Sequence, residues 1–365
     1  MKAMMLTGIR QMEMKEVPEP EITRPDDVKI KMLVLGICGS DIHYYTQGQI
    51  GSQKVEYPFP VGHEGAGIVI ETGSAVTRVK KGDKIAIEPA MPCWECDQCL
   101  AGRHHTCRKL RFLGCPGQAD GCLTEYIVMP ESCCFPLAEI LSPDHGSISE
   151  PMAIGIYAVK KSGGVAEQKI GILGFGPIGM SVMLATKAEN ASAFYITDKI
   201  DERLSKALKE GATLTGNPLN DDIVKKILQS ENLGLDIVFE CCGQQEALDQ
   251  AVDLLKPGGK LIVVGIPEFA RWSLNVENTR RKEISLQFIR RQVDCVETAL
   301  ELMAKGKIKI DNMVTHRFPF SATKEAFDLV ASYGDGVMKA MIDFSRLVHF
   351  SAANLGIAGS AGFFR

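Results

Sequence analysis

Five residues with metal-binding or proton-transferring side chains lie in two glycine-rich segments of the chain: Cys38, Ser40, His43, His63 and Glu64. A thiolate, an imidazole and a carboxylate are the donors that a catalytic zinc ion uses, and a hydroxyl with a second imidazole can relay a proton. Alone, Cys38 or His63 would more often be a buried structural residue. The further motifs described next favour the catalytic interpretation.

A second cluster consists of four cysteines in the spacing C-x2-C-x2-C-x7-C: Cys93, Cys96, Cys99 and Cys107. Four thiolates so close in sequence can surround one zinc ion tetrahedrally and leave no open position, which makes the site structural. A chance cluster or a local disulfide pair is the alternative, and a reducing compartment disfavours the disulfide. The sequence therefore predicts a structural zinc site in addition to the catalytic one.

Glu150 is a further candidate for the catalytic site. It precedes Pro151, and proline is favoured at the first position of a helix. We therefore expect Glu150 at the start of a helix, with its carboxylate free to turn toward a site. Helix capping or an interaction with the helix dipole is the alternative role for this carboxylate.

A glycine-rich G-x-G-x-x-G motif at 174–179 follows a buried-strand pattern and precedes a helical one. Its first glycine allows a tight turn, its second lets a pyrophosphate approach the backbone, and its third lets the helix pack on the strand. Asp198 ends the next strand, where a carboxylate binds the ribose hydroxyls and repels a 2′-phosphate. The motif predicts a dinucleotide site that prefers NAD to NADP.

Two other segments are expected to contact the dinucleotide. Val264-Gly265-Ile266 follows a strand at its carboxyl end, where sheets of this kind bind ligands, and we place it near the nicotinamide. Arg203 either contacts the adenine half or is a solvated surface arginine. The full set of expected cofactor contacts is Gly174, Gly176, Pro177, Ile178, Gly179, Asp198, Arg203, Val264, Gly265 and Ile266.

The elements that must position these residues fall into two patterns. The first part of the chain is rich in loops and short strands, with strands expected at 28–34, 67–71, 84–88 and 121–128. From 169 to 289, strands alternate with helices, which predicts a parallel, doubly wound sheet. Strands are expected there at 169–173, 193–197, 235–240, 260–264 and 284–289, and helices at 180–188, 201–210, 222–229 and 245–255.

After about residue 290, the chain is expected to return to its first domain, with helices at 295–305 and 322–332 and strands at 313–320 and 338–344. The fold class is therefore α/β. We predict that 1–155 and 290–345 form one domain, that 156–289 form the second, and that 346–365 are a tail of unknown role.

Composition limits the classes of partner. The 365 residues carry 41 basic and 45 acidic side chains without a long run of either sign, which leaves no electrostatic footprint for nucleic acid. No apolar segment reaches the ~20 residues of a membrane span, and no signal-peptide pattern begins the chain. Twelve cysteines in a chain of this size indicate metal or reduced thiols. We expect a cytoplasmic protein with a small-molecule substrate.

The motifs together resemble those of the zinc-containing medium-chain alcohol dehydrogenases, most of all the sorbitol dehydrogenase (L-iditol 2-dehydrogenase) group, over about residues 1–345. The resemblance implies a GroES-like catalytic domain and a Rossmann domain that binds NAD. It implies a catalytic zinc held by Cys38, His63 and either Glu64 or Glu150, with exchange between the two glutamates during turnover. It also implies a homo-oligomer, either a dimer or a tetramer.

The same resemblance assigns roles around the substrate. Ser40 would take the substrate proton and pass it through the cofactor ribose to His43 and solvent. Tyr44, Glu150 and Arg290 would contact a polyol, whose secondary alcohol would lose a hydride to NAD and become a ketose. Alternatives within the same chemistry are a polyol phosphate, a threonine-like amino alcohol and a simple alcohol. A zinc-free reductase and a non-catalytic NAD-binding protein are the remaining alternatives.

Overall fold

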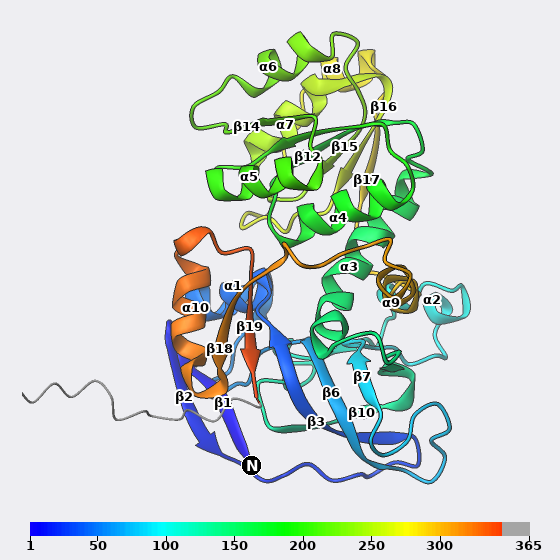
Figure 1. The fold of residues 1–365 in the computed structure, drawn as a ribbon, viewed down its shortest axis with the longest axis vertical. Helices are drawn as coiled ribbons and strands as arrows, with labels where there is room; N and C mark the ends of the chain where they lie inside the picture. The colour runs from blue at the N-terminus through cyan, green and yellow to red at the C-terminus, as the bar shows by residue number, and fades with distance from the viewer. Residues whose placement is uncertain (345–365) are drawn as a thin grey trace, which may run out of the picture.

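The computed structural model describes residues 1–344, and the predicted tail lies outside the described residues. Two β-sheets form the centres of two halves of the molecule, and the long helix α3 (Pro143–Ser162) lies between them (Figure 1). The α/β class predicted from the sequence is confirmed. Among the described residues, no helix is both long enough and apolar enough to cross a membrane.

The first sheet is mostly antiparallel and has seven strands. Its path is β11 (Cys134–Pro136), β7 (Lys84–Ile87), β6 (Glu64–Thr72), β3 (Asp27–Gly36), β19 (Lys339–Asp343) and β18 (Val314–Pro319), and β10 (Tyr126–Pro130) also pairs with β3. Short strand pairs accompany it: β1 (Lys2–Gly8) with β2 (Gln11–Glu16), β4 (Gln49–Ile50) with β5 (Gln53–Lys54), and β8 (Ala90–Met91) with β9 (Arg111–Phe112). The helices of this half are α1 (Gly39–Gln47), α2 (Asp97–Leu100), α9 (Val296–Ala304) and α10 (Thr323–Ala331).

Strand register in this sheet brings three distant segments to one place. Gly36, the last residue of β3, lies opposite Glu64 on β6 and opposite Met341 on β19. Because side chains alternate along a strand, this register fixes which of them face one another. The residues just after β3, at the start of β6 and at the start of β19 therefore meet at the same end of the sheet.

The second sheet has six parallel strands in the order β14 (Leu214–Gly216), β13 (Ala193–Thr197), β12 (Lys169–Leu173), β15 (Leu235–Glu240), β16 (Leu255–Val263) and β17 (Ser285–Phe288). Its helices are α4 (Pro177–Ala188), α5 (Asp201–Glu210), α6 (Ile223–Ser230), α7 (Gln245–Leu254) and α8 (Val276–Arg281). The strand order reverses between β12 and β15, which opens a crevice at their carboxyl ends. The short strand β14 was not predicted, because three residues carry too little pattern.

Helix α3 corrects the prediction for Glu150. The helix begins after its cap Ser142, with Pro143 at its first position, so Pro151 lies inside the helix and Glu150 near its middle. A proline costs an internal helix about 3 kcal/mol, and local sequence cannot show that tertiary packing offsets this cost. Here the helix is buried along most of its length between the two halves. At Gly155 it approaches α4 so closely that a Cβ would lie 2.6 Å from the Ser181 backbone.

The C-terminal elements join the first half. Strands β18 and β19 extend the first sheet from β3, α9 packs against α3, and α10 contacts α1. The sheet thus joins β3, from near the start of the chain, to β19, from the end of its described length, and Figure 1 shows this blue strand and this red strand in the same half of the molecule. The exact domain boundaries given above stay predictions.

Candidate active site

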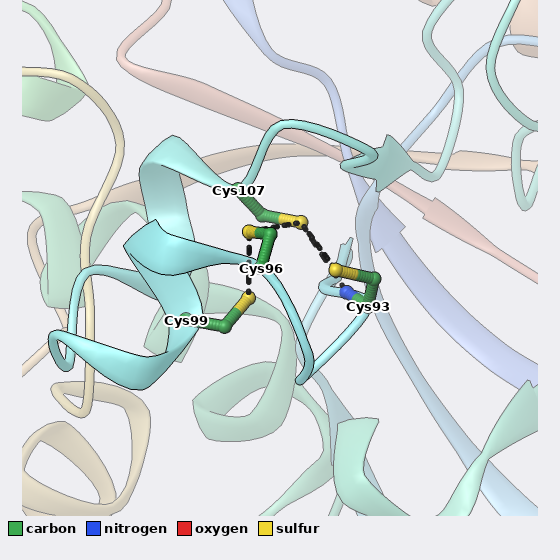
Figure 2. A group of neighbouring side chains, drawn as sticks. All are labelled: Cys93, Cys96, Cys99 and Cys107. Carbon is green, nitrogen blue, oxygen red and sulfur yellow. Dashed lines mark hydrogen bonds between the residues drawn. The ribbon is translucent and has the colours of Figure 1, made fainter.

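The four cysteines of the C-x2-C-x2-C-x7-C motif converge around α2 (Figure 2). The Sγ atom of Cys96 lies 3.6 Å from that of Cys99 and 3.9 Å from that of Cys107, and Cys107 Sγ lies 3.5 Å from Cys93 Sγ. All four are free thiols. Zinc–sulfur bonds of about 2.3 Å in a tetrahedron place the sulfur atoms roughly 3.8 Å apart. The lobe therefore has the donors and the spacing of a structural zinc site.

A second set of donors is formed by Cys38, His63 and Glu64, whose ligand atoms all lie within 4.8 Å of one another. Cys38 caps α1 just after β3, and His63 and Glu64 stand at the start of β6, so the β3–β6 register assembles them. His63 and Glu64 are 5% and 1% exposed. A thiolate, an imidazole and a carboxylate with a fourth position free fit a catalytic zinc ion.

Asp41 holds this set in place, and the sequence interpretation missed it. Its Oδ1 lies 3.4 Å from Nδ1 of His63 and accepts a hydrogen bond from Gly62 N, while its Oδ2 accepts one from Cys38 N. The Asp41 carboxylate thus orients the His63 ring and fixes the backbone of Cys38, and it leaves Nε2 of His63 for the metal. An acidic residue three positions after Cys38, at N3 of a helix, was the available signal.

The electrostatics of the site favour a cation. Burial alone would lower the pKa of His63, but the Asp41 carboxylate and the Cys38 thiolate raise it well above its ordinary value. Burial raises the pKa of Glu150 to about 7. The charge of His63 lowers this pKa, and the Glu64 carboxylate raises it. Glu150 is 7% exposed and lies outside the close set of three donors. Several buried acidic groups thus face the place where a metal ion would sit.

Glu64 has a buried ion-pair partner that sequence reasoning missed. The ammonium group of Lys339, the first residue of β19, donates to Glu64 Oε1 at 2.8 Å and to Oε2 at 2.6 Å. Both side chains are almost fully buried. A lysine buried to this degree is rare unless it is paired with an acidic group.

The expected proton relay lies on α1. Ser40 and His43 are one turn apart on the helix, so their side chains share a face. His43 Nδ1 lies 3.7 Å from Oε1 of Glu268, which follows β16 in the other half of the molecule. Burial lowers the pKa of His43, although the Glu268 carboxylate opposes this effect. The side chain of His43 is partly exposed, and that of Glu268 is more exposed. A proton on His43 therefore has a path to solvent.

The structure places the two neighbouring arginines of the predicted substrate site in different surroundings. Tyr44 is buried near Cys115, as the site requires, but Arg290 is exposed. The guanidinium of Arg291 instead lies 3.6 Å from the ring centroid of Phe112, and its Nη1 is buried without a hydrogen-bond partner among residues 1–344.

The two arginines differ in burial because of the backbone conformation after β17. Arg291 has a φ of 53°, a left-handed conformation that interrupts the alternation of side chains along the extended chain. Burial, followed by the charge of Arg290, lowers the pKa of Arg291 to about 10, while Glu150 and Tyr44 raise it. These two neighbours belong to the candidate site. Sequence register alone could not locate the conformational break.

The glycine motif forms the turn that a dinucleotide site needs. Gly174 has a φ of 94°, and a Cβ on Gly179 would lie 2.1 Å from the Gly174 carbonyl oxygen. Asp198 accepts hydrogen bonds from Phe175 N at 2.7 Å and from Ile200 N at 2.9 Å, so it lies beside the motif. The positions Gly176, Pro177 and Ile178 surround the start of α4, where phosphate binding is favoured.

Two flanking residues complete the crevice. Arg203 is not solvated: it is 8% exposed, lies 3.9 Å from Asp198, and donates through Nη2 to the carbonyl of Val337 at 3.0 Å. Glu240, at the end of β15, was missed by the sequence interpretation. It accepts from Cys242 N and Gly243 N, and a Cβ on Gly265 would lie 2.7 Å from its Oε2. Val264, Gly265 and Ile266 therefore stand at this edge of the crevice.

Comparisons with known proteins agree with this geometry. Residues 24–139 match the alcohol dehydrogenase GroES-like domain and residues 177–305 the zinc-binding dehydrogenase family. The chain is 34% identical to a sorbitol dehydrogenase of Bacillus subtilis, over 94% of this chain and 97% of that protein, and 32% identical to an L-idonate 5-dehydrogenase of Vitis vinifera, over 91% and 92%. A crystal structure of an Escherichia coli oxidoreductase of unknown specificity, 30% identical, superimposes with a TM-score of 0.88 over 94% of this chain and 98% of that one.

The chain therefore belongs to the zinc-containing medium-chain alcohol dehydrogenase superfamily. Within it, the two zinc sites and the nucleotide crevice define a zinc-dependent dehydrogenase that acts on alcohols or polyols with a nicotinamide dinucleotide. The structural and catalytic zinc sites are those built by the cysteine lobe and by Cys38, His63 and Glu64.

The cysteine lobe can be tested by counting metal. Replacing Cys99, which is buried, by serine removes one thiolate from a four-thiolate site, so the zinc content should fall from about two ions per chain to about one, and the melting temperature should fall with it because metal binding contributes folding free energy. Elemental analysis and calorimetry measure both. The control is Cys241→Ala outside the lobe, which should retain both ions. Retention of both ions by Cys99→Ser would show that the lobe does not bind zinc.

Proposed function

We propose that this chain oxidises a secondary alcohol of a free polyol to a ketose, with NAD as the hydride acceptor. The observation that carries the proposal is the position of Arg291, whose Nη1 is buried without a hydrogen-bond partner among residues 1–344 and whose guanidinium lies over Phe112, a ring 5.3 Å from that of His63. The buried Tyr44 hydroxyl, which contacts Gln53 and Cys115, is a second polar group near Arg291. Hydrogen-bonding groups of this kind select for a hydroxylated substrate over an apolar one. The relatives named sorbitol dehydrogenase and L-idonate 5-dehydrogenase are named for polyhydroxylated substrates, a polyol and a sugar acid, which supports a hydroxylated substrate here.

Each residue of the site has a distinct role in the proposed reaction. Zinc, when bound, supplies a Lewis acid that lowers the pKa of an alcohol, and the bound nicotinamide supplies a hydride acceptor. Ser40 takes the hydroxyl proton of the substrate, and His43 passes that proton toward solvent. Tyr44 and Arg291 orient the remaining hydroxyls, and the buried Glu150 carboxylate interacts electrostatically with Arg291. A hydride lost from carbon and a proton lost from oxygen leave a carbonyl.

The experiment is to follow NADH formation with sorbitol, xylitol, ribitol, iditol and galactitol, and with a sugar-alcohol phosphate, an aldonate, threonine and ethanol, each with and without a zinc chelator. We expect chelator-sensitive oxidation of free polyols. The Cys38→Ser variant should lose turnover while NAD binding changes by no more than a few-fold, because the nucleotide crevice lies elsewhere. Oxidation of only the phosphate, the amino alcohol or the simple alcohol would contradict the polyol assignment and leave the dehydrogenase chemistry standing.

Cofactor choice depends on Asp198 in this proposal. Its carboxylate favours ribose hydroxyls over a 2′-phosphate, and the adjacent Arg203 is held by Val337 and so is not free to bind that phosphate. Replacing Asp198 by alanine should weaken NAD binding and relax discrimination against NADP by roughly 1 to 3 kcal/mol. The ratio of kcat/KM for the two cofactors measures this change. The control is Asp249→Ala on α7, and an unchanged ratio in Asp198→Ala would remove the ribose role.

The two neighbouring arginines provide a matched pair for the substrate site. Arg291→Gln should lower kcat/KM for the best polyol by roughly ten- to a hundredfold, the cost of losing hydrogen bonds from a charged group. Arg290→Gln should change it by no more than about twofold, as expected for an exposed residue. Steady-state kinetics of both variants test this assignment. The reverse ranking would return the substrate role to Arg290.

A homo-oligomer stays a prediction. The edge strand β17 supports it, because all four of its residues are exposed, including Leu286 and Phe288, and an exposed strand edge can pair with another chain.

A further inference from the structure

Lys339, the first residue of the last described strand β19, is buried, and its ammonium group contacts Glu64 of the zinc donor set. Its Nζ donates to both carboxylate oxygens of Glu64, at 2.8 and 2.6 Å, and to the carbonyl oxygen of Ile37 at 3.0 Å. An ammonium group has three hydrogens, so all of its donors are used. The lysine is 2% exposed and lies 275 residues from Glu64 in sequence.

Glu64 is at the same time close to the metal-binding atoms. One of its carboxylate oxygens lies within 4.8 Å of the ligand atoms of Cys38 and His63. Glu64 can contact Lys339 and the metal-binding atoms at the same time because residue 36 is a glycine. A Cβ on Gly36 would lie 2.4 Å from Glu64 Oε2 and 3.4 Å from Lys339 Cδ. Any larger residue at this place would displace the carboxylate or the lysine.

The ion pair changes what Glu64 can do as a ligand. A carboxylate has about four lone-pair positions, and an ammonium that contacts both oxygens occupies part of them and neutralises part of the charge that would bind a metal. A buried carboxylate without a partner is strongly unfavourable. When Glu64 leaves the metal, Lys339 still pairs with it, so its release does not leave an unpaired buried charge.

We propose that Lys339 is a positioning residue that keeps Glu64 an exchangeable zinc ligand, so that its coordination position can pass to an incoming oxygen. Among residues 1–344, Lys339 is the cationic side chain that forms an ion pair with Glu64, so without it the metal would compensate the carboxylate charge and Glu64 would become a fixed ligand. The inference builds on the zinc site and on the dehydrogenase reaction proposed above.

The test uses cobalt in place of zinc, because Co²⁺ has visible absorption bands that report its ligands, whereas zinc has none. Cobalt-loaded wild-type protein, Lys339→Met and Lys339→Arg are titrated with imidazole, which competes for the exchangeable position. In Lys339→Met, imidazole should bind at least about tenfold more weakly and the absorption bands should differ from those of the wild type, within the range of effects seen for groups that hold metal ligands. Lys339→Arg should restore both. Unchanged bands and affinity in Lys339→Met would overturn the proposal.

Glu64→Gln with Lys339 intact keeps the proposal testable if Lys339→Met does not fold. An exchangeable ligand can be removed at little cost, so cobalt affinity should fall by less than about tenfold, whereas a loss of more than about a hundredfold would show that Glu64 is a fixed ligand. The double variant Lys339→Met/Glu64→Gln should regain wild-type imidazole binding, and failure to do so would count against the mechanism. No substrate or NAD is present, so these results do not depend on whether the polyol assignment succeeds.

Discussion

The pairing of β3 with β6 is the constraint on which the rest of the site depends. Gly36 lies opposite Glu64, so Cys38, just after β3, lies close to His63, just before β6. The strand pairing itself therefore brings the metal-binding atoms together. A slip of one residue would turn the side chains of β6 to the other face and separate the donors. Strand β19 pairs with β3 at the same residue, which is why Lys339 reaches Glu64.

Charge balance around these donors explains why so many ionisable groups are buried together. Cys38, Glu64, Glu150 and Asp41 are potential anions in a region with little access to water, and Lys339 and Arg291 supply only part of the opposing charge. Zinc would supply the remainder, so metal binding and the stability of this end of the sheet are coupled. The buried acidic groups are thus stable together because the metal and the two cationic side chains balance their charge.

The active site also depends on contacts between the two halves. Helix α3 carries Glu150 from the first half and packs on α4 of the second, Arg203 joins α5 to the Val337 carbonyl, and His43 faces Glu268. The nucleotide crevice and the zinc donors are therefore held in register by packed elements and not only by the connecting chain. Such a construction allows hydride transfer between groups bound on different halves.

Features that depend on local spacing could be predicted from the sequence. The cysteine lobe, the glycine turn with Asp198, the alternation of strands and helices, and the segments containing Cys38 and His63 all follow from residues close together in the chain. The position of Glu150 inside a buried helix follows from long-range packing, which outweighs the local helix-start signal of Pro151. The burial of the Arg291 Nη1 atom and the exposure of Arg290 follow from a left-handed backbone conformation at Arg291, which local sequence does not reveal. Lys339 was invisible to sequence reasoning because its partner Glu64 is 275 residues away, and only strand pairing brings them together.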